Sequence, residues 1–176
     1  MALVTPTWMV KAIYNIRPAT LKRLGIQAVL TDLDNTLIAW NNPNGTEQLR
    51  NWLAEMHTAG ITVMVVSNNN HQRVAKAVAG FNVPFTARAL KPLAVGINRA
   101  VRELKLPKTA CIMVGDQLLT DVIAGNLAGV RTILVQPLIE TDQWNTLPNR
   151  FIEGFIKRDM KRKGTYHYME DIDDRN

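Results

Sequence analysis

The sequence predicts a three-layer α/β fold, in which a parallel sheet of five strands has helices on both faces. Two observations predict this fold. Short apolar runs alternate with helical patterns five times between residues 26 and 135, and such alternation is typical of a parallel sheet because parallel strands need a crossover between them. Polar residues also follow directly after the apolar runs, where open parallel sheets bind their ligands.

The apolar runs mark the expected strands. Residues 61–66 are apolar or β-branched throughout, as expected for a strand that is buried on both faces of a sheet. The complete set of predicted strands is residues 26–33, 61–66, 83–86, 110–114 and 131–135.

Helical periodicity fills the intervals between these strands. Apolar residues recur on one helical face between Leu49 and Met56, and Gly60 then ends this helix. Another helix is expected to begin at Pro92, because a first helical residue needs no backbone N–H. The remaining helices are expected over residues 71–80 and 119–128.

The flanks divide the chain into three expected regions: a lead-in segment at 1–25, a core at 26–148, and a basic amphipathic helix with an acidic tail at 149–176. Within the lead-in segment, residues 7–16 have the apolar spacing of a short amphipathic helix. In residues 149–163, aromatic and aliphatic side chains fall near one side of a helix, and basic side chains surround them.

Composition and charge exclude several classes of protein. The chain of 176 residues has the size of one domain, or of one domain with a tail. No apolar run approaches the roughly 20 residues that cross a bilayer. Cys111 is the only cysteine, which excludes an internal disulfide and a cysteine-rich zinc site. The net charge of +6, concentrated at the two ends, favours an acidic partner (nucleic acid, anionic lipid or a phosphorylated substrate), unless it reflects surface composition alone.

The first predicted strand ends in two acids, Asp32 and Asp34. Because they are two residues apart in an extended chain, their side chains point the same way. One carboxylate can act as a nucleophile or metal ligand while the other transfers protons. The alternative interpretation is a polar turn after a strand.

Ser67 and Lys91 follow later strands. Ser67 is the only serine and is followed by Asn68; a hydroxyl and backbone N–H groups at a strand-to-helix turn can hold phosphate oxygens. The alternative is a helix N-cap, for which serine and asparagine are common. Lys91 can offset the charge of a phosphate and a carboxylate, or it can be one more solvated lysine.

Asp116 and Asp121 follow the predicted strand at 110–114. Hard cations such as Mg²⁺ take oxygen ligands and usually keep several waters. Asp116 is placed like a carboxylate ligand, and Asp121 like a weak ligand or a residue that supports one. The alternative is a Gly-Asp turn with Asp121 in the first turn of a helix, where the helix dipole favours an acid.

The order of these residues resembles the haloacid dehalogenase-like (HAD) phosphohydrolase superfamily, in which a DxDxT loop precedes a serine or threonine, a lysine and further acids. The sequence DLDNT at residues 32–36 is similar to the form found in subfamily III. The whole chain, with its lead-in segment and the sequence GDQ at residues 115–117, resembles the YqeG family of subfamily IIIA. That family is similar to mitochondrial phosphatidylglycerophosphate phosphatases, and the resemblance implies a Rossmann-like HAD fold.

The resemblance also implies a role for each residue. Asp32 would attack phosphorus, Asp34 would protonate the leaving group and then activate water, and Lys91 would stabilise the transferring phosphoryl group. Mg²⁺ would be held by Asp32, the backbone carbonyl of Asp34 and Asp116. Asp121 would support this metal site. The substrate-binding residues would be Ser67, Asn68 and Thr36.

The intervals between these motifs are too short for the cap domain that HAD proteins often carry, so the predicted site is open. An open site suits a large phosphorylated substrate, and a neighbouring subunit of a homo-oligomer is another source of cover. The sequence therefore predicts a Mg²⁺-dependent phosphomonoesterase, with phosphatidylglycerophosphate as the first candidate substrate.

The expected compartment is the cytoplasm, with peripheral contact between the basic ends of the chain and an anionic membrane surface. Two alternatives stay open. One is a non-enzymatic module that binds nucleic acid or the ribosome, although no basic motif with interleaved aromatic residues supports nucleic-acid binding. The other is a receiver-like phosphoacceptor domain, in which the acid pair and the phosphoacceptor come from different strands.

Overall fold

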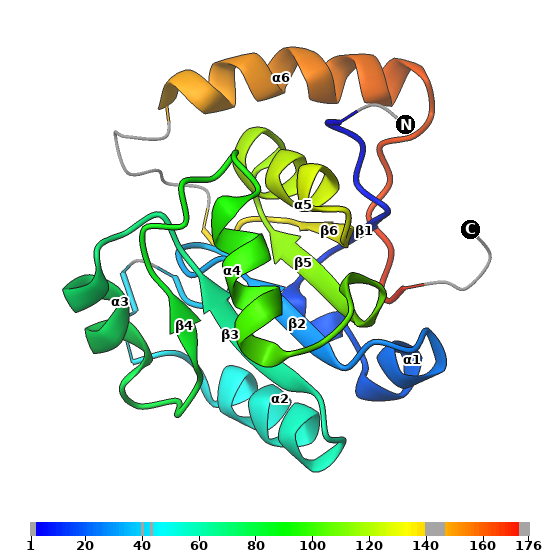
Figure 1. The fold of residues 1–176 in the computed structure, drawn as a ribbon. Coiled ribbons are helices and arrows are strands. Elements are labelled where there is room, and N and C mark those ends of the chain that lie inside the picture. Colours follow the sequence, from blue (N-terminus) through cyan, green and yellow to red (C-terminus); the bar gives the residue numbers. More distant parts are fainter. Residues whose placement is uncertain (1–2, 40, 43, 140–146, 173–176) are drawn as a thin grey trace.

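The computed structural model describes residues 3–39, 41–42, 44–139 and 147–172. Its centre is a sheet of six parallel strands in the order β1-β6-β5-β2-β3-β4 (Figure 1). The predicted α/β class is therefore confirmed, with six strands in place of five. The strands are β1 (Trp8–Val10), β2 (Ala28–Thr31), β3 (Thr62–Val66), β4 (Phe85–Thr86), β5 (Cys111–Gly115) and β6 (Arg131–Val135).

Helices cover both faces of this sheet. The α-helices are α1 (Pro18–Arg23), α2 (Glu47–Thr58), α3 (His71–Val78), α4 (Val95–Leu104), α5 (Ile123–Ala128) and α6 (Leu147–Arg162), with short turns η1 (Ile13–Asn15), η2 (Lys108–Ala110) and η3 (Leu118–Val122). Because side chains alternate along a strand, each face has its own core. Val29 and Val65 pack in the core under α1, α2 and α3. Leu30 and Met64 pack in the core under α4 and α5.

Polar side chains cap the first turns of two of these helices. Thr46 precedes α2, and its Oγ1 accepts a hydrogen bond from the backbone N–H of Leu49 at 3.1 Å. Asn70 precedes α3, and its Oδ1 accepts a hydrogen bond from the backbone N–H of Arg73 at 2.9 Å. These caps satisfy N–H groups that have no partner within the helix. The cap at Asn70 also fixes the turn that carries Arg73.

The lead-in segment differs from its prediction. Within residues 7–16, Trp8–Val10 form the strand β1, which pairs in parallel with β6. Only Ile13–Asn15 are helical, as the single turn η1. All three residues of β1 are buried, which a strand covered on both faces permits and a helix with one apolar face does not. This strand accounts for the difference between five and six strands.

The prediction that Pro92 begins a helix is wrong. Pro92 follows Lys91 through a cis peptide bond and lies in a turn, and α4 begins at Val95. Close packing at the start of α4 explains the difference. A Cβ on Gly96 would lie 2.4 Å from the Cβ of Ala89, so the helix starts where glycine lets its backbone meet the loop after β4.

The C-terminal flank lies beside β1 and β6. The predicted helix over residues 149–163 corresponds to α6, which spans the top of the molecule in Figure 1. Its Met160 shares a small apolar cluster with Met9 of β1 and Leu134 of β6. In the predicted acidic tail, residues 173–176 lie outside the described residues. No helix in the described part of the chain has the length and apolar character needed to cross a membrane.

Candidate active site

The predicted site residues follow the carboxyl ends of the strands. Asp32 comes after β2, Ser67 after β3 and Asp116 after β5. The chain runs from β2 to β3 on one side and reaches β5 on the other, which makes this edge a topological switch point, where parallel sheets bind ligands. From Asp34 to Lys91 the described residues form α2, β3, α3, β4 and their connections, so they place no separate domain over the edge.

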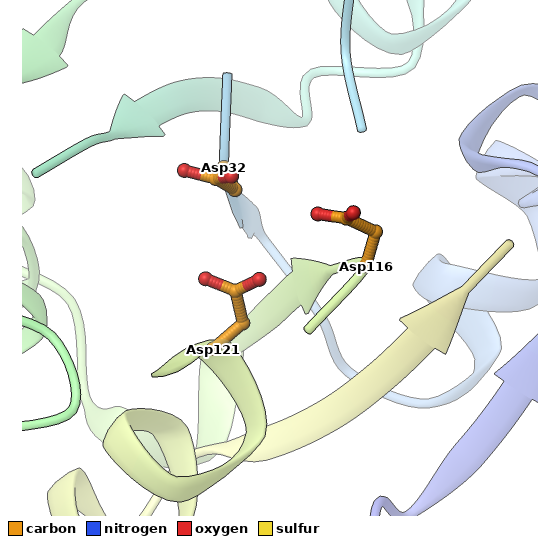
Figure 2. Close-up of side chains that lie close together, drawn as sticks. All are labelled: Asp32, Asp116 and Asp121. Carbon is orange, nitrogen blue, oxygen red and sulfur yellow. The ribbon is translucent and has the colours of Figure 1, made fainter. Parts of the chain in front are cut away.

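Three carboxylates meet at this edge. Asp32, Asp116 and Asp121 each place one carboxylate oxygen within 4.8 Å of those of the other two. The three side chains point toward a common space (Figure 2). Asp116 and Asp121 are buried, and Asp32 is partly buried. A set of anionic oxygen donors is what a hard divalent cation such as Mg²⁺ requires, so these residues fit the predicted metal.

Lys91 joins two of these acids. Its Nζ lies 2.7 Å from Oδ1 of Asp32 and 2.8 Å from Oδ1 of Asp121, and its side chain is 2% exposed. Burial lowers the pKa of Lys91, but the two carboxylates outweigh burial and hold this pKa above its usual value. The ammonium group therefore stays charged, and it fixes the orientation of Asp32.

Asp121 is held on both oxygens. Oδ1 meets Lys91, and Oδ2 accepts a 3.1 Å hydrogen bond from the backbone N–H of Gln117. A Cβ on Gly115 would lie 2.2 Å from Cγ of Asp121, so only glycine leaves room for this carboxyl group. Burial raises the pKa of Asp121 to about 6, with a further increase from Asp32 and an opposing effect from Lys91. These contacts make Asp121 a support for Lys91.

Two residues that were predicted to touch substrate lie against other site residues. The Oγ1 of Thr36 donates a hydrogen bond to Oδ1 of Asp116 at 3.1 Å. The side-chain amide of Asn68 donates to the backbone carbonyl of Lys91 at 2.9 Å and accepts from its N–H at 2.8 Å. Thr36 thus positions Asp116, and Asn68 positions Lys91. Their contacts with substrate stay predictions.

Ser67 is buried at the end of β3. Its backbone N–H donates to the carbonyl of Thr86, and its carbonyl accepts from the N–H of Ala89, both at 2.9 Å. Its Oγ accepts hydrogen bonds from the backbone N–H and the side-chain amide of Asn69, both at 3.2 Å. Because Asn69 is the donor in both contacts, neither of them uses the hydroxyl hydrogen of Ser67.

Asp34 has partners that the sequence interpretation missed. Arg73 forms a bidentate pair with it, with Nη1 3.0 Å from Oδ2 and Nη2 2.9 Å from Oδ1. The side-chain amide of Asn69 donates to the same Oδ2 at 2.8 Å. Asn69 stands next to the predicted Asn68, and the available signal for Arg73 was its place in the first turn of the helix after Ser67.

The arrangement suits the transfer of an anionic group. One carboxylate, on Asp32, is held by a permanently charged lysine, and a second, on Asp34, is held by an arginine. Cations beside both carboxylates lower the cost of bringing a phosphate dianion to this edge. The carboxylate cluster offers oxygen ligands for a metal ion at the same place.

Comparisons with known proteins agree with this description. A family model described as HAD-hydrolase-like matches residues 89–145. Over 165 residues the chain is 44% identical to a Bacillus subtilis protein named probable phosphatase YqeG, and the match covers 94% of this chain and 96% of that protein.

Solved structures share the fold. An uncharacterized protein from Listeria monocytogenes serotype 4b superimposes with a TM-score of 0.54 at 17% identity, over 67% of this chain and 84% of that one. The cobalt-bound deoxy-D-mannose-octulosonate 8-phosphate phosphatase of Haemophilus influenzae superimposes with a TM-score of 0.51 at 18% identity, over 65% of this chain and 70% of that one. At these identities the similarity concerns the fold alone.

Proposed function

The chain belongs to the YqeG family of HAD-like phosphatases, and on that basis we propose that it is a Mg²⁺-dependent phosphomonoesterase that works through an aspartyl-phosphate intermediate. One observation carries the proposal. The buried ammonium of Lys91 holds one oxygen of Asp32, and a second, separately held carboxylate, Asp34, follows two residues later. This supplies a nucleophile, a charge that stabilises a phosphoryl group, and a group for proton transfer.

Asp32 is the nucleophile. Because Lys91 holds Oδ1, Oδ2 is the oxygen that attacks phosphorus. The new bond from this oxygen to phosphorus forms while the bond between phosphorus and the ester oxygen breaks. Asp34 gives a proton to the ester oxygen, so the leaving group departs as a neutral alcohol. For this step the oxygen of Asp34 that carries the proton gives up the hydrogen bond that it accepts from Arg73.

Water completes the reaction. It attacks the phosphorus of the aspartyl-phosphate, and Asp34, now a carboxylate, accepts a proton from it. The bond between phosphorus and the Asp32 oxygen breaks, which releases inorganic phosphate and restores both carboxyl groups. The hydroxyl of Ser67 and the ammonium of Lys91 bind the phosphoryl oxygens in both steps and stabilise their charge.

The residues that would hold Mg²⁺ are Asp32, Asp116 and the backbone carbonyl of Asp34, with Asp121 in support. When bound, the ion neutralises charge on the phosphoryl oxygens. Thr36 orients Asp116, and Lys91 orients Asp32. Such outer contacts fix metal ligands in place.

Hydrolysis of p-nitrophenyl phosphate by purified protein with Mg²⁺ tests the proposal. We expect Asp32→Asn to lower kcat by at least about a thousandfold, because an amide oxygen is a poor nucleophile. Asp159→Asn, on the exposed surface of α6, is the matched control and leaves kcat unchanged. Circular dichroism confirms that both variants are folded. Wild-type protein without hydrolysis of any phosphomonoester would contradict the enzyme proposal.

Metal removal tests the cofactor. We expect dialysis against EDTA to abolish hydrolysis and added Mg²⁺ to restore it. Three carboxylates cluster around one lysine, so without a metal ion their excess negative charge repels a phosphate dianion. Full activity after EDTA treatment would contradict the Mg²⁺ requirement. Release of one phosphate per protein without further turnover would instead favour the receiver-like alternative.

The outward face of α6 supports the proposal that the substrate is large, anionic and located at a membrane surface. Phe151, Phe155, Arg158 and Arg162 recur every three or four residues, which aligns them along one side of the helix. Phe151 and Phe155 are 72% and 57% exposed. Residues 149–163 contain six basic and two acidic residues, and each basic side chain near an anionic surface contributes about 1 kcal/mol to binding.

The opposite side of α6 attaches it to the domain. Glu153 on that side accepts a 2.9 Å hydrogen bond from the backbone N–H of Leu119, in η3, which follows shortly after Asp116 in the chain. A bilayer docked on the outward face of α6 would contact a helix whose other side is hydrogen-bonded to η3, which carries Asp121. Phosphatidylglycerophosphate is the first candidate substrate, and a large soluble phosphomonoester is the second. The expected compartment is the cytoplasm, with peripheral membrane contact.

Sedimentation with vesicles tests this docking. We expect phosphatidylglycerol vesicles, and not phosphatidylcholine vesicles, to bind the protein in a manner that salt weakens. The double variant Phe151→Ser/Phe155→Ser removes the apolar contact and lowers binding. Leu127→Ser, at another exposed apolar side chain, is the control and leaves binding unchanged. Equal sedimentation of wild type and double variant would contradict the docking role of α6, and binding to RNA alone would favour the nucleic-acid alternative.

A further inference from the structure

Arg73 combines a fixed position with unused hydrogen-bonding capacity. Its side chain is 39% exposed, while both Nη atoms contact Asp34. A guanidinium group has five N–H donors, and two of them serve Asp34. Within the part of the chain that the structure describes, no acceptor is found for the other three. The group is therefore anchored on one side and able to bind a further anion.

Arg73 lies beside the residue that contacts the leaving group in the proposed mechanism. Asp34 is the residue that protonates the ester oxygen in the proposed mechanism, so the leaving group begins beside Asp34. Arg73 is one hydrogen bond away from the same carboxylate. The first few atoms of the leaving group thus lie within reach of the guanidinium, whereas the transferring phosphoryl group is bound by Lys91 and Ser67.

From this geometry we propose that Arg73 is a specificity residue, which binds a second anionic group on the leaving group of the substrate. The inference rests on the proposed phosphatase function and deepens it, because it names the substrate class. The preferred substrates are phosphomonoesters whose leaving group carries a carboxylate or a phosphodiester a few bonds from the ester oxygen. An arginine fork binds both groups through charge-assisted, bidentate hydrogen bonds.

Matched substrates measure this preference. Glycerol 3-phosphate has a neutral three-carbon leaving group, and 3-phosphoglycerate has a leaving group of similar size with a carboxylate. Glycerophosphoglycerol phosphate carries a phosphodiester in its place. We expect wild-type protein to hydrolyse one or both anionic substrates with a kcat/KM at least about tenfold above that for glycerol 3-phosphate, and the larger ratio identifies the preferred anion.

Three variants on α3 separate recognition of the anion from general effects of charge. Arg73→Gln removes the fork, and we expect the ratio to fall to about one. Its effect on Asp34 acts on every substrate alike, so that effect cancels in the ratio. Lys76→Gln removes the same charge from an exposed position on the same helix and leaves the ratio as in wild type. Arg73→Lys retains the charge and loses the fork, and we expect it to keep part of the preference.

Binding without turnover provides an independent measurement. In an Asp32→Asn background, calorimetry with 3-phosphoglycerate and glycerophosphoglycerol phosphate should give a Kd at least about tenfold weaker when Arg73→Gln is added, whereas the Kd of glycerol 3-phosphate changes little. A kcat/KM ratio or a Kd difference that Arg73→Gln leaves intact would overturn the inference. Normal hydrolysis of p-nitrophenyl phosphate by the wild-type protein, measured alongside, shows that the proposed function still stands.

Discussion

At the scale of single residues, Lys91 determines the charge balance of the site. Its side chain is 2% exposed and lies between Asp32 and Asp121, of which Asp121 is 1% exposed. A buried ion pair contributes little to stability beyond what an apolar pair would give, but removal of one partner leaves the other charged and unpaired. We therefore expect Lys91 to be needed for the tolerance of Asp121 in the core, in addition to its proposed role in catalysis.

This balance predicts the effect of Lys91→Met. We expect the free energy of unfolding to fall by about 3–5 kcal/mol, because Asp121 loses its cation, and we expect hydrolysis to be abolished. Addition of Asp121→Asn removes the unpaired charge and recovers part of the stability, without recovery of activity. Urea unfolding and p-nitrophenyl phosphate hydrolysis measure the two effects.

The exposed residue Lys22 provides the control. Lys22→Met should leave both the unfolding free energy and the activity unchanged. Equal stability of the single variant Lys91→Met and wild type would show that Asp121 does not depend on the lysine. Loss of stability that Asp121→Asn fails to reduce would show that packing of the lysine stem, rather than its charge, is responsible.

The sequence could predict which residues gather at the site, but not all of their contacts. Asp32, Asp34 and Asp116 could be placed together because each follows a strand whose end lies at one edge of a parallel sheet. Arg73 could not, because its contact with Asp34 depends on where α3 begins and how that helix lies against the sheet. Spacing along the chain carries no information on such an angle.

At the scale of elements, α6 is tied to the site by one buried acid. Glu153 is 1% exposed, and its Oε1 accepts the 2.9 Å hydrogen bond from the backbone N–H of Leu119. Its Oε2 lies 3.4 Å from Nζ of Lys157. Leu119 belongs to η3, the turn that also carries Asp121. The helix therefore stabilises the loop that supplies the acids of the site.

Glu153→Ala tests this connection. We expect it to lower the free energy of unfolding by about 1–3 kcal/mol, because a backbone N–H is left without its partner, and to lower kcat because η3 becomes less well held. Glu153→Gln retains an acceptor oxygen at the same distance from the backbone, and it should retain most of the free energy of unfolding and most of kcat. Urea unfolding and kcat for p-nitrophenyl phosphate are the measurements. Identical behaviour of the alanine and glutamine variants would mean that the hydrogen bond contributes nothing to the loop.

The accuracy of the predicted elements follows the strength of their local signals. The strand at residues 131–135 was placed correctly and the one at 61–66 to within one residue, because continuous apolar runs between polar residues are distinctive. β1 was missed because three buried residues next to a 3-10 turn have no periodicity that separates strand from helix. Its identity depends on the free edge of β6, which is a tertiary property.

At the scale of the whole molecule, the two flanks pack on each other as well as on the sheet. Met169 forms a parallel bridge with Val10, and it exchanges backbone hydrogen bonds with Met9 and Lys11 at 2.8 and 3.1 Å. Ile172 is 4% exposed and lies in the same core cluster as Val10. The two flanks are thus joined to each other and to the core, although they are far apart in the sequence.

Ion pairs also connect the N-terminal flank to the C-terminal flank. Oδ2 of Asp171 lies 2.7 Å from Nε of Arg17 and accepts a 2.9 Å hydrogen bond from Oγ1 of Thr20. Lys11 also pairs with Glu170. The pair of Lys11 and Glu170 is exposed on both sides, and Arg17 is exposed in its pair with Asp171. Pairs with exposed partners contribute little individually, so we assign most of the coupling energy between the flanks and the core to the apolar contact of Ile172.

Ile172→Ala tests whether the flanks unfold together with the core. We expect it to lower the free energy of unfolding of the whole chain by about 2–5 kcal/mol, with one transition that is the same by circular dichroism and by tryptophan fluorescence. Ile152→Ala, at a side chain that is 51% exposed, is the control and should leave the midpoint unchanged. Two separate transitions in the Ile172→Ala protein would mean that the flanks form a unit of their own. A single transition at a lower urea concentration would mean that the six strands and both flanks unfold as one cooperative unit. Loss of one contact at residue 172 would then weaken the sheet that holds the site.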